Sequence, residues 1–97
     1  MNKTIKVPIS IEDNREVEFL FHKYNSLMSI VAYLQENGKM SEQAIDKKID
    51  ELVYLNIDLE KKKKICGEKY KPADIGPKYN YTFEFDYCEL VYTEINE

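Results

Sequence analysis

Hydrophobic and polar residues alternate near both ends of the chain, which is the period of a β-strand. Near the start, the apolar residues at period two are Ile5, Val7, Ile9 and Ile11. Pro8 falls on the opposite face, and because proline has no N–H to donate, this strand is expected at the edge of a sheet. Near the end, residues 79–87 carry an aromatic side chain at every odd position and a polar one at every even position. We therefore predict strands over residues 4–11 and 79–95.

Between the strands the period changes to that of an amphipathic helix, which we predict over residues 15–37. Its seam consists of Val17, Leu20, Tyr24, Leu27, Val31 and Leu34, and is widened by Phe21 and Met28. Either Asp13 or Asn14 can serve as the N-cap, and Glu16 has the spacing of a capping box with Asp13. Gly38 is the expected C-terminal stop, because glycine adopts the left-handed conformation there without strain.

A second helix is predicted over residues 42–66 and would reach Tyr70 if Gly67 lies within it. Ser41 is its expected N-cap, and Met40 has the spacing of a hydrophobic staple with the apolar residue at position 45. The seam consists of Ile45, Ile49, Leu52, Asn56 and Leu59, with Val53 alongside.

Asn56 leaves two interpretations of this second seam. A polar seam residue can fix the register or the oligomeric state of a helical pair. Alternatively, a small rotation of the helix brings Leu55 into the seam in its place. The sequence leaves both open.

The order of elements predicts an α+β fold of β-α-α-β type in a single domain, residues 1–97. Because so few residues separate the helices, they should form an antiparallel hairpin. The hairpin would cover one face of a small antiparallel sheet made by the N- and C-terminal strands. Proline and glycine place a loop at residues 71–78, ahead of the long strand.

The long strand is the feature that this arrangement leaves unexplained, because its partner is much shorter. Its alternation changes phase after Tyr87, which a bulge near Cys88 and Glu89 or burial of both faces would explain. The segment Asp-Tyr-Cys-Glu has no Gly or Asn-Gly, which argues against a tight hairpin there. We therefore expect another chain to extend the sheet at this strand. The expected interface residues are Phe85, Tyr87, Cys88, Leu90, Val91, Tyr92 and Ile95.

Composition narrows the class of protein. The net charge of −4 and the pI near 5.1 argue against a nucleic-acid or anionic-membrane binder, which would carry a basic face. The sequence has no apolar run of the roughly 20 residues that a membrane span needs. It has two cysteines and no hydrophobic signal segment, so we expect reduced thiols and a cytoplasmic location.

No set of residues has the spacing of a catalytic, cofactor or metal site. Cys88 and His22 would make a thiol–imidazole pair only if the fold brought them together, and nothing orients the imidazole. A metal site from these two and Cys66 lacks any CxxC or HxxxH spacing. The basic run at residues 61–64 fits a solvated helix end, with i,i+4 pairs such as Asp58–Lys62. We expect no enzyme, no cofactor and no small-molecule substrate.

The function that we expect is therefore non-enzymatic. The protein would be a protein–protein interaction module, either a homo-oligomer or a small subunit of a larger assembly, using its C-terminal aromatic strand for β-augmentation. The alternative is a small acidic inhibitor or antitoxin-like protein that binds a basic site on an enzyme. That alternative rests on the carboxylates of the C-terminal segment, namely Glu84, Asp86, Glu89, Glu94 and Glu97.

Overall fold

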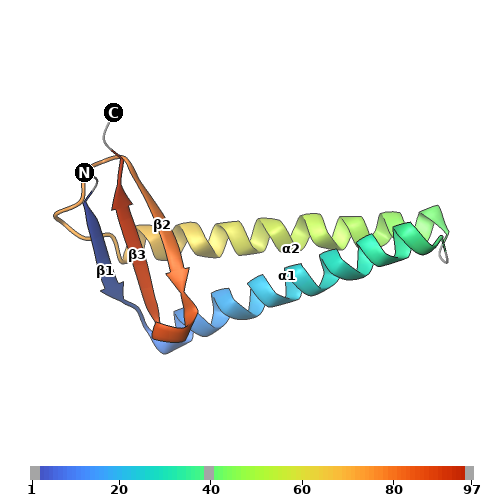
Figure 1. Cartoon of the computed structure of the whole chain (residues 1–97), viewed down its shortest axis with the longest axis horizontal. Coiled ribbons are helices and arrows are strands. Elements are labelled where there is room, and N and C mark those ends of the chain that lie inside the picture. Colours follow the sequence, from blue (N-terminus) through green and yellow to red (C-terminus); the bar gives the residue numbers. More distant parts are fainter. Residues whose placement is uncertain (1–2, 39–40, 96–97) are drawn as a thin grey trace.

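The computed structural model, which describes residues 3–38 and 41–95, contains a long helical hairpin with a small sheet at its base (Figure 1). The elements are β1 (Thr4–Pro8), α1 (Ile11–Asn37), α2 (Glu42–Lys69), β2 (Tyr79–Glu84), the 3-10 turn η1 (Phe85–Tyr87) and β3 (Glu89–Glu94). The predicted α+β class, with a helical hairpin and an antiparallel sheet of N- and C-terminal strands, is confirmed. The extension of the sheet by a second chain stays a prediction.

The sheet has three strands in the order β1-β3-β2, and both pairings are antiparallel. The single strand predicted over residues 79–95 is therefore wrong, because the chain reverses at η1 and returns as the central strand. The reversal also explains the change of phase in the alternation. Phe83 stands opposite Leu90, so odd positions of β2 share a face with even positions of β3.

The turn between β2 and β3 places a cysteine where glycine or asparagine is usual. Cys88 has φ 54 and ψ 49, in the left-handed region, and its N–H donates to the carbonyl of Phe85 at 3.3 Å. The thiol then donates to the carbonyl of Ile9 at 3.4 Å, which ties the turn to the segment between β1 and α1. The sequence signal for a hairpin is absent because this residue is not a glycine.

The first helix begins earlier than the sequence predicted. Ser10 is its N-cap, and the Ser10 hydroxyl accepts a hydrogen bond from the N–H of Asp13 at 3.1 Å. An N-cap at Asp13 or Asn14 is therefore wrong, and so is the capping box with Glu16, because all three lie inside α1. The predicted strand over residues 4–11 is shorter for the same reason and ends at Pro8, which does lie on an edge strand.

The caps around the hairpin loop agree with prediction. Gly38 is left-handed with φ 59, and its N–H donates to the carbonyl of Leu34. The Ser41 hydroxyl accepts from the N–H of Ala44 at 3.2 Å. The staple predicted from Met40 lies outside the described residues.

In α2, Leu55 is buried and Asn56 is exposed, so the helix rotates and the leucine occupies the seam. The helix also runs through Gly67 to Lys69, so the longer of the two predicted extents is correct to within one residue.

The core lies at the base, where the inner face of the sheet packs on the start of α1 and the end of α2. Its buried residues are Ile9, Val17, Leu59, Cys66, Ile75, Leu90 and Tyr92. Gly67 allows a close contact between helix and sheet, because a Cβ at this position would lie 2.7 Å from the ring of Tyr81. The Tyr92 hydroxyl donates to the carbonyl of Gly67 at 2.6 Å, so β3 is fixed to the backbone of α2.

Replacing Gly67 by alanine is expected to lower the free energy of unfolding by about 1–2 kcal/mol, because the added methyl overpacks the Tyr81 ring. In an ordinary helix interior the same change would stabilise by about 1 kcal/mol. Urea unfolding measures the difference. In a Tyr81→Leu background the loss should shrink or reverse, and a Gly67→Ala variant more stable than the parent protein would contradict this packing.

The left-handed residue gives a second prediction. The free energy of unfolding of Cys88→Gly should lie within about 1 kcal/mol of that of the parent protein, because glycine adopts the left-handed conformation without strain. That of Cys88→Val should be about 2 kcal/mol lower than that of Cys88→Gly. Thermal unfolding compares the pair. At Thr93, within strand β3, the order should invert, with valine the more stable substitution. Equal stability of the two Cys88 variants would rule out strain at this turn.

Candidate interaction surfaces

The interface residues predicted from the sequence do not form one surface. Leu90 and Tyr92 are 0% exposed and lie in the core. Strand β3 pairs with β1 on one side and β2 on the other, so it offers no open edge, and strand addition along residues 85–95 is wrong. The remaining residues are Phe85, Cys88, Val91 and Ile95, which are partly buried, and Tyr87, which is exposed.

The open edges of the sheet belong to β1 and β2. On β1, the Ile9 N–H donates to the Cys88 carbonyl, so alternate residues from Thr4 to Pro8 direct their backbone groups away from β3. That outward set includes Lys6 and Pro8, and both residue types discourage pairing at an edge. Strand β1 is therefore a protected edge.

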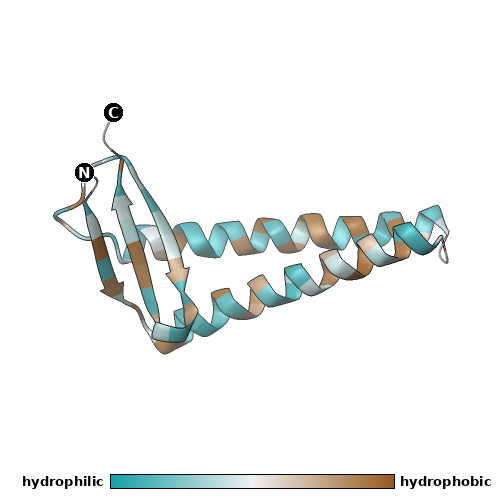
Figure 2. Cartoon of the chain, viewed as in Figure 1, coloured by the Kyte–Doolittle hydropathy of each residue, from teal (hydrophilic) through white to brown (hydrophobic). Residues whose placement is uncertain are grey.

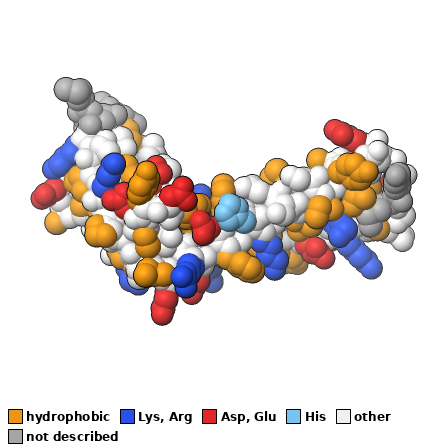
Figure 3. All heavy atoms as spheres, turned by 60° about the horizontal axis from the view of Figure 1, so that its bottom comes forward, with side chains coloured by type: hydrophobic (Ala, Val, Ile, Leu, Met, Phe, Trp, Pro, Cys, Tyr) orange, Lys and Arg blue, Asp and Glu red, His pale blue; other side chains and the backbone are white. Residues whose placement is uncertain are grey.

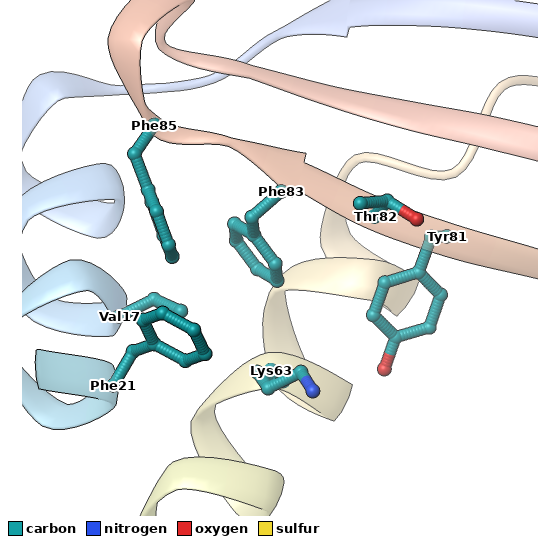
Figure 4. A pocket seen from close by; sticks show the side chains of 7 residues that line it. All are labelled: Val17, Phe21, Lys63, Tyr81, Thr82, Phe83 and Phe85. Atoms are coloured by element: carbon teal, nitrogen blue, oxygen red, sulfur yellow. The ribbon is translucent and has the colours of Figure 1, made fainter. Parts of the chain in front are cut away.

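Strand β2 has no such protection. The Ile95 N–H donates to the Lys78 carbonyl at 2.9 Å. Because bonded positions alternate along an antiparallel pair, the even-numbered residues of β2 bond to β3. The odd-numbered residues Tyr79, Tyr81 and Phe83 therefore direct their backbone N–H and C=O groups to the open edge. Next to this edge is a recess of about 270 Å³ (Figure 4). Its lining residues are Val17, Phe21, Lys63, Tyr81, Thr82, Phe83 and Phe85.

Apolar residues recur along both helices of the hairpin (Figure 2), and several of them are exposed. Phe19 is 65% exposed and Ile30 is 47% exposed on α1, and Val53 is 51% exposed on α2. Hydrophobic side chains reach the surface along the length of the shaft in the view of Figure 3. Among the described shaft residues beyond the base, only Val31 and Leu55 are buried hydrophobics. The hairpin therefore leaves apolar side chains exposed that its own core does not use, and such surfaces often mark contacts with another protein.

One side of the shaft forms a shallow groove, here called the hairpin trough, whose lining includes Phe19 and Ile30 but not Val53. One part of it, about 530 Å³, is lined by Phe19, His22, Lys23, Ser26, Leu27, Ile30 and Glu51. An adjoining part, about 290 Å³, is lined by Lys23, Leu27, Glu51, Tyr54, Leu55 and Asp58. The rim is basic on α1 and acidic on α2.

Sequence reasoning missed this surface because it followed the strongest apolar seam on each helix. A second signal was present, since Phe19, Lys23, Ser26, Ile30 and Tyr33 recur at intervals of three or four residues. This stripe mixes apolar and polar residues, so it does not stand out from a solvated helix face.

A polar cluster around the buried side chain of Asp13 joins the start of α1 to the end of α2. One Asp13 carboxylate oxygen accepts from Lys62 at 3.1 Å, and the other accepts from Lys69 at 2.9 Å and from the Tyr70 hydroxyl at 2.6 Å. The Tyr70 oxygen in turn accepts from the N–H of Ser10 at 3.1 Å. These bonds, with that from Tyr70 foremost, hold the pKa of Asp13 far below its ordinary value.

The cluster also revises the interpretation of the lysine run. Lys62 pairs with Asp13 and with Glu16 at 2.8 Å, across the hairpin, rather than with Asp58 on its own helix. Lys63 pairs with Glu60 at 3.3 Å, while Lys61 and its neighbour at position 64 are exposed. Lys62 therefore joins the two helices, whereas the exposed lysines fit the predicted solvated helix end.

The two thiols have different surroundings. Cys66 is fully buried, and burial raises the pKa of its thiol, which disfavours the thiolate that nucleophilic chemistry requires. His22 lies in the hairpin trough and Cys88 in the β2–β3 turn, where its thiol faces backbone carbonyls. Within residues 3–38 and 41–95, no three His, Cys, Asp or Glu side chains are grouped as a metal site would need.

Comparisons of the chain with protein-family profiles, with curated proteins and with solved structures give no match. Of the helices in the described part of the chain, none is both long enough and apolar enough to span a membrane.

The Asp13 cluster predicts a pH dependence. Because the pKa of Asp13 is lower in the folded chain than in the unfolded chain, its ionisation stabilises the fold above about pH 4, and this stabilisation is lost as the pH falls. Asp13→Asn should lower the free energy of unfolding by about 2 kcal/mol at pH 7 and flatten the loss of stability between about pH 4 and pH 2. Urea unfolding at several pH values measures both.

The exposed Asp50→Asn change on α2 is the matched control and should leave that curve in place. Parallel curves for Asp13→Asn and the parent protein would show that ionisation of Asp13 does not stabilise the fold.

Proposed function

We propose that this protein is a non-enzymatic protein–protein interaction module that self-associates by packing the hairpin troughs of two copies together. The observation that carries the proposal is the line of apolar side chains in the trough, where Phe19 and Ile30 on α1 and Tyr54 on α2 are exposed and Leu27 is partly buried. The expectation of a homo-oligomer is kept, but its interface moves from the C-terminal strand to the hairpin.

The energetic argument begins with the small core of the shaft. Two helices in contact bury one stripe each, whereas four helices also bury the stripes that face the other pair. Fully burying one large apolar side chain contributes about 1.5–3 kcal/mol, and in a dimer each such residue is buried in both copies. That gain is comparable with the roughly 4–15 kcal/mol that association costs in lost freedom of motion. Trough-to-trough packing would therefore remove the exposed side chains of Phe19, Ile30 and Tyr54 from water.

The charges at the rim support one orientation of the pair. Lys23 lines the trough from α1, and Glu51 and Asp58 line it from α2. If α1 of each copy packs on α2 of the other, the lysine of one copy faces the carboxylates of the other. This arrangement uses the same patch on both copies, as a closed two-fold dimer requires.

The test is the absolute mass in solution, measured by light scattering after size exclusion. The parent protein should have the mass of a dimer, and Ile30→Glu should reduce it to that of a monomer, because a carboxylate cannot be buried in the trough without a partner. Val53→Glu is the matched control, since this residue has similar exposure but does not line the trough.

High salt gives a second arm of the same test. An apolar interface should persist when salt is raised, whereas the electrostatic complex of a small acidic inhibitor should weaken steeply. A parent protein that is monomeric at tens of micromolar, or an Ile30→Glu variant that stays dimeric, would contradict the proposal.

A further inference from the structure

We propose that the open edge of β2 and the recess beside it form a second binding site, which accepts an extended segment of another protein as an added strand. The segment places an apolar side chain in the recess and a carboxylate next to Lys63. This site is separate from the hairpin trough, because the lining residues of the two do not overlap.

The backbone of β2 supplies the first part of the argument. Asn80 and Thr82 use their backbone groups to pair with β3, so the groups of Tyr81 and Phe83 lie along the open edge. Neither proline nor lysine interrupts residues 79–84, in contrast to β1. Addition of a strand would satisfy these groups with main-chain hydrogen bonds that any extended sequence can make.

The recess supplies the selectivity for a side chain. Phe85 stacks with Phe83 at 5.8 Å between ring centroids and lies 5.6 Å from Phe21, so aromatic rings from β2, η1 and α1 make one wall. Its volume of about 270 Å³ is below the range of about 300–1,000 Å³ that is typical of small-molecule sites. The recess therefore fits one large apolar side chain of a strand better than it fits a free ligand.

The hairpin provides a surface beneath the added strand. In Figure 1 the shaft continues past β2 on the side away from β1, so the helices extend beyond the edge of the sheet. In Figure 4 Val17 and Phe21 on α1 and Lys63 on α2 face the aromatic side chains of β2. Inward-facing side chains of an added strand would continue the layer that these residues cover.

The charge of the recess identifies the polar group of the partner. Lys63 is the charged residue among those that line it, and its ammonium group is 3.3 Å from a carboxylate oxygen of Glu60. This ion pair is partly exposed, so a carboxylate of the incoming segment can share the ammonium group. A segment with Asp or Glu two residues from its apolar anchor presents both groups on one face, because side chains alternate along a strand.

The probe is the capped peptide acetyl-Thr-Val-Thr-Phe-Thr-Glu-Thr-amide, titrated into the full chain and followed by the amide signals of the protein. Binding should be saturable, and the amides of Tyr81 and Phe83 should gain protection from hydrogen exchange. A peptide with Ala in place of Phe should bind about tenfold more weakly, because the recess stays empty.

Exchanging the charges of the two partners separates a loss of binding from a loss of folding, because a variant that binds the peptide of opposite charge must still be folded. Lys63→Glu should weaken binding of the Glu peptide about fivefold, and a peptide with Lys in place of Glu should restore it. Lys61→Glu is the matched control, since this residue lies outside the recess, and it should leave both affinities unchanged.

Two results would overturn the proposal. One is the absence of saturable binding at millimolar peptide. The other is protection of the Tyr81 and Phe83 amides in the free protein, which would mean that a second copy already occupies the edge.

Discussion

The fixing of the central strand to the end of α2 determines the rest of the architecture. Tyr92 bonds to the carbonyl of Gly67, and the missing side chain at that glycine lets the sheet lie against the helix. The Asp13 cluster then joins the start of α1 to the same end of α2. Because these contacts are confined to the base, the shaft extends away from the sheet and its outer faces are left for other contacts.

The helices were predictable from sequence because each has a strong apolar period and a cap of the usual residue type. Gly38 and Ser41 are examples, and both act as predicted. The start of α1 was not found, because Asp13 and Asn14 are themselves favourable N-caps. In the fold these two side chains are buried and serve contacts with α2 and with η1 instead. The N-cap preference of a residue depends on its neighbours in sequence, so it does not predict contacts with residues far along the chain.

The reversal at residues 85–88 was missed for a different reason. Its left-handed residue is Cys88, and hairpin turns are recognised in sequences mainly by glycine or asparagine. The change of phase in the alternation was the correct signal, but it was interpreted as a bulge in one strand. The error moved the predicted interface onto β3, whose Leu90 and Tyr92 are core residues, and it hid the open edge of β2. The trough was equally hidden, because its residues come from two helices whose relative rotation only the fold defines.

The central claim is that two copies meet at the hairpin trough, and contacts between copies test it most directly. A mixture of isotope-labelled and unlabelled protein allows intermolecular nuclear Overhauser effects to be selected. The account predicts such effects from the methyl groups of Leu27 and Ile30 to the ring of Tyr54 in the other copy. Intermolecular effects only from strand residues, or none at concentrations where the mass is that of a dimer, would contradict it.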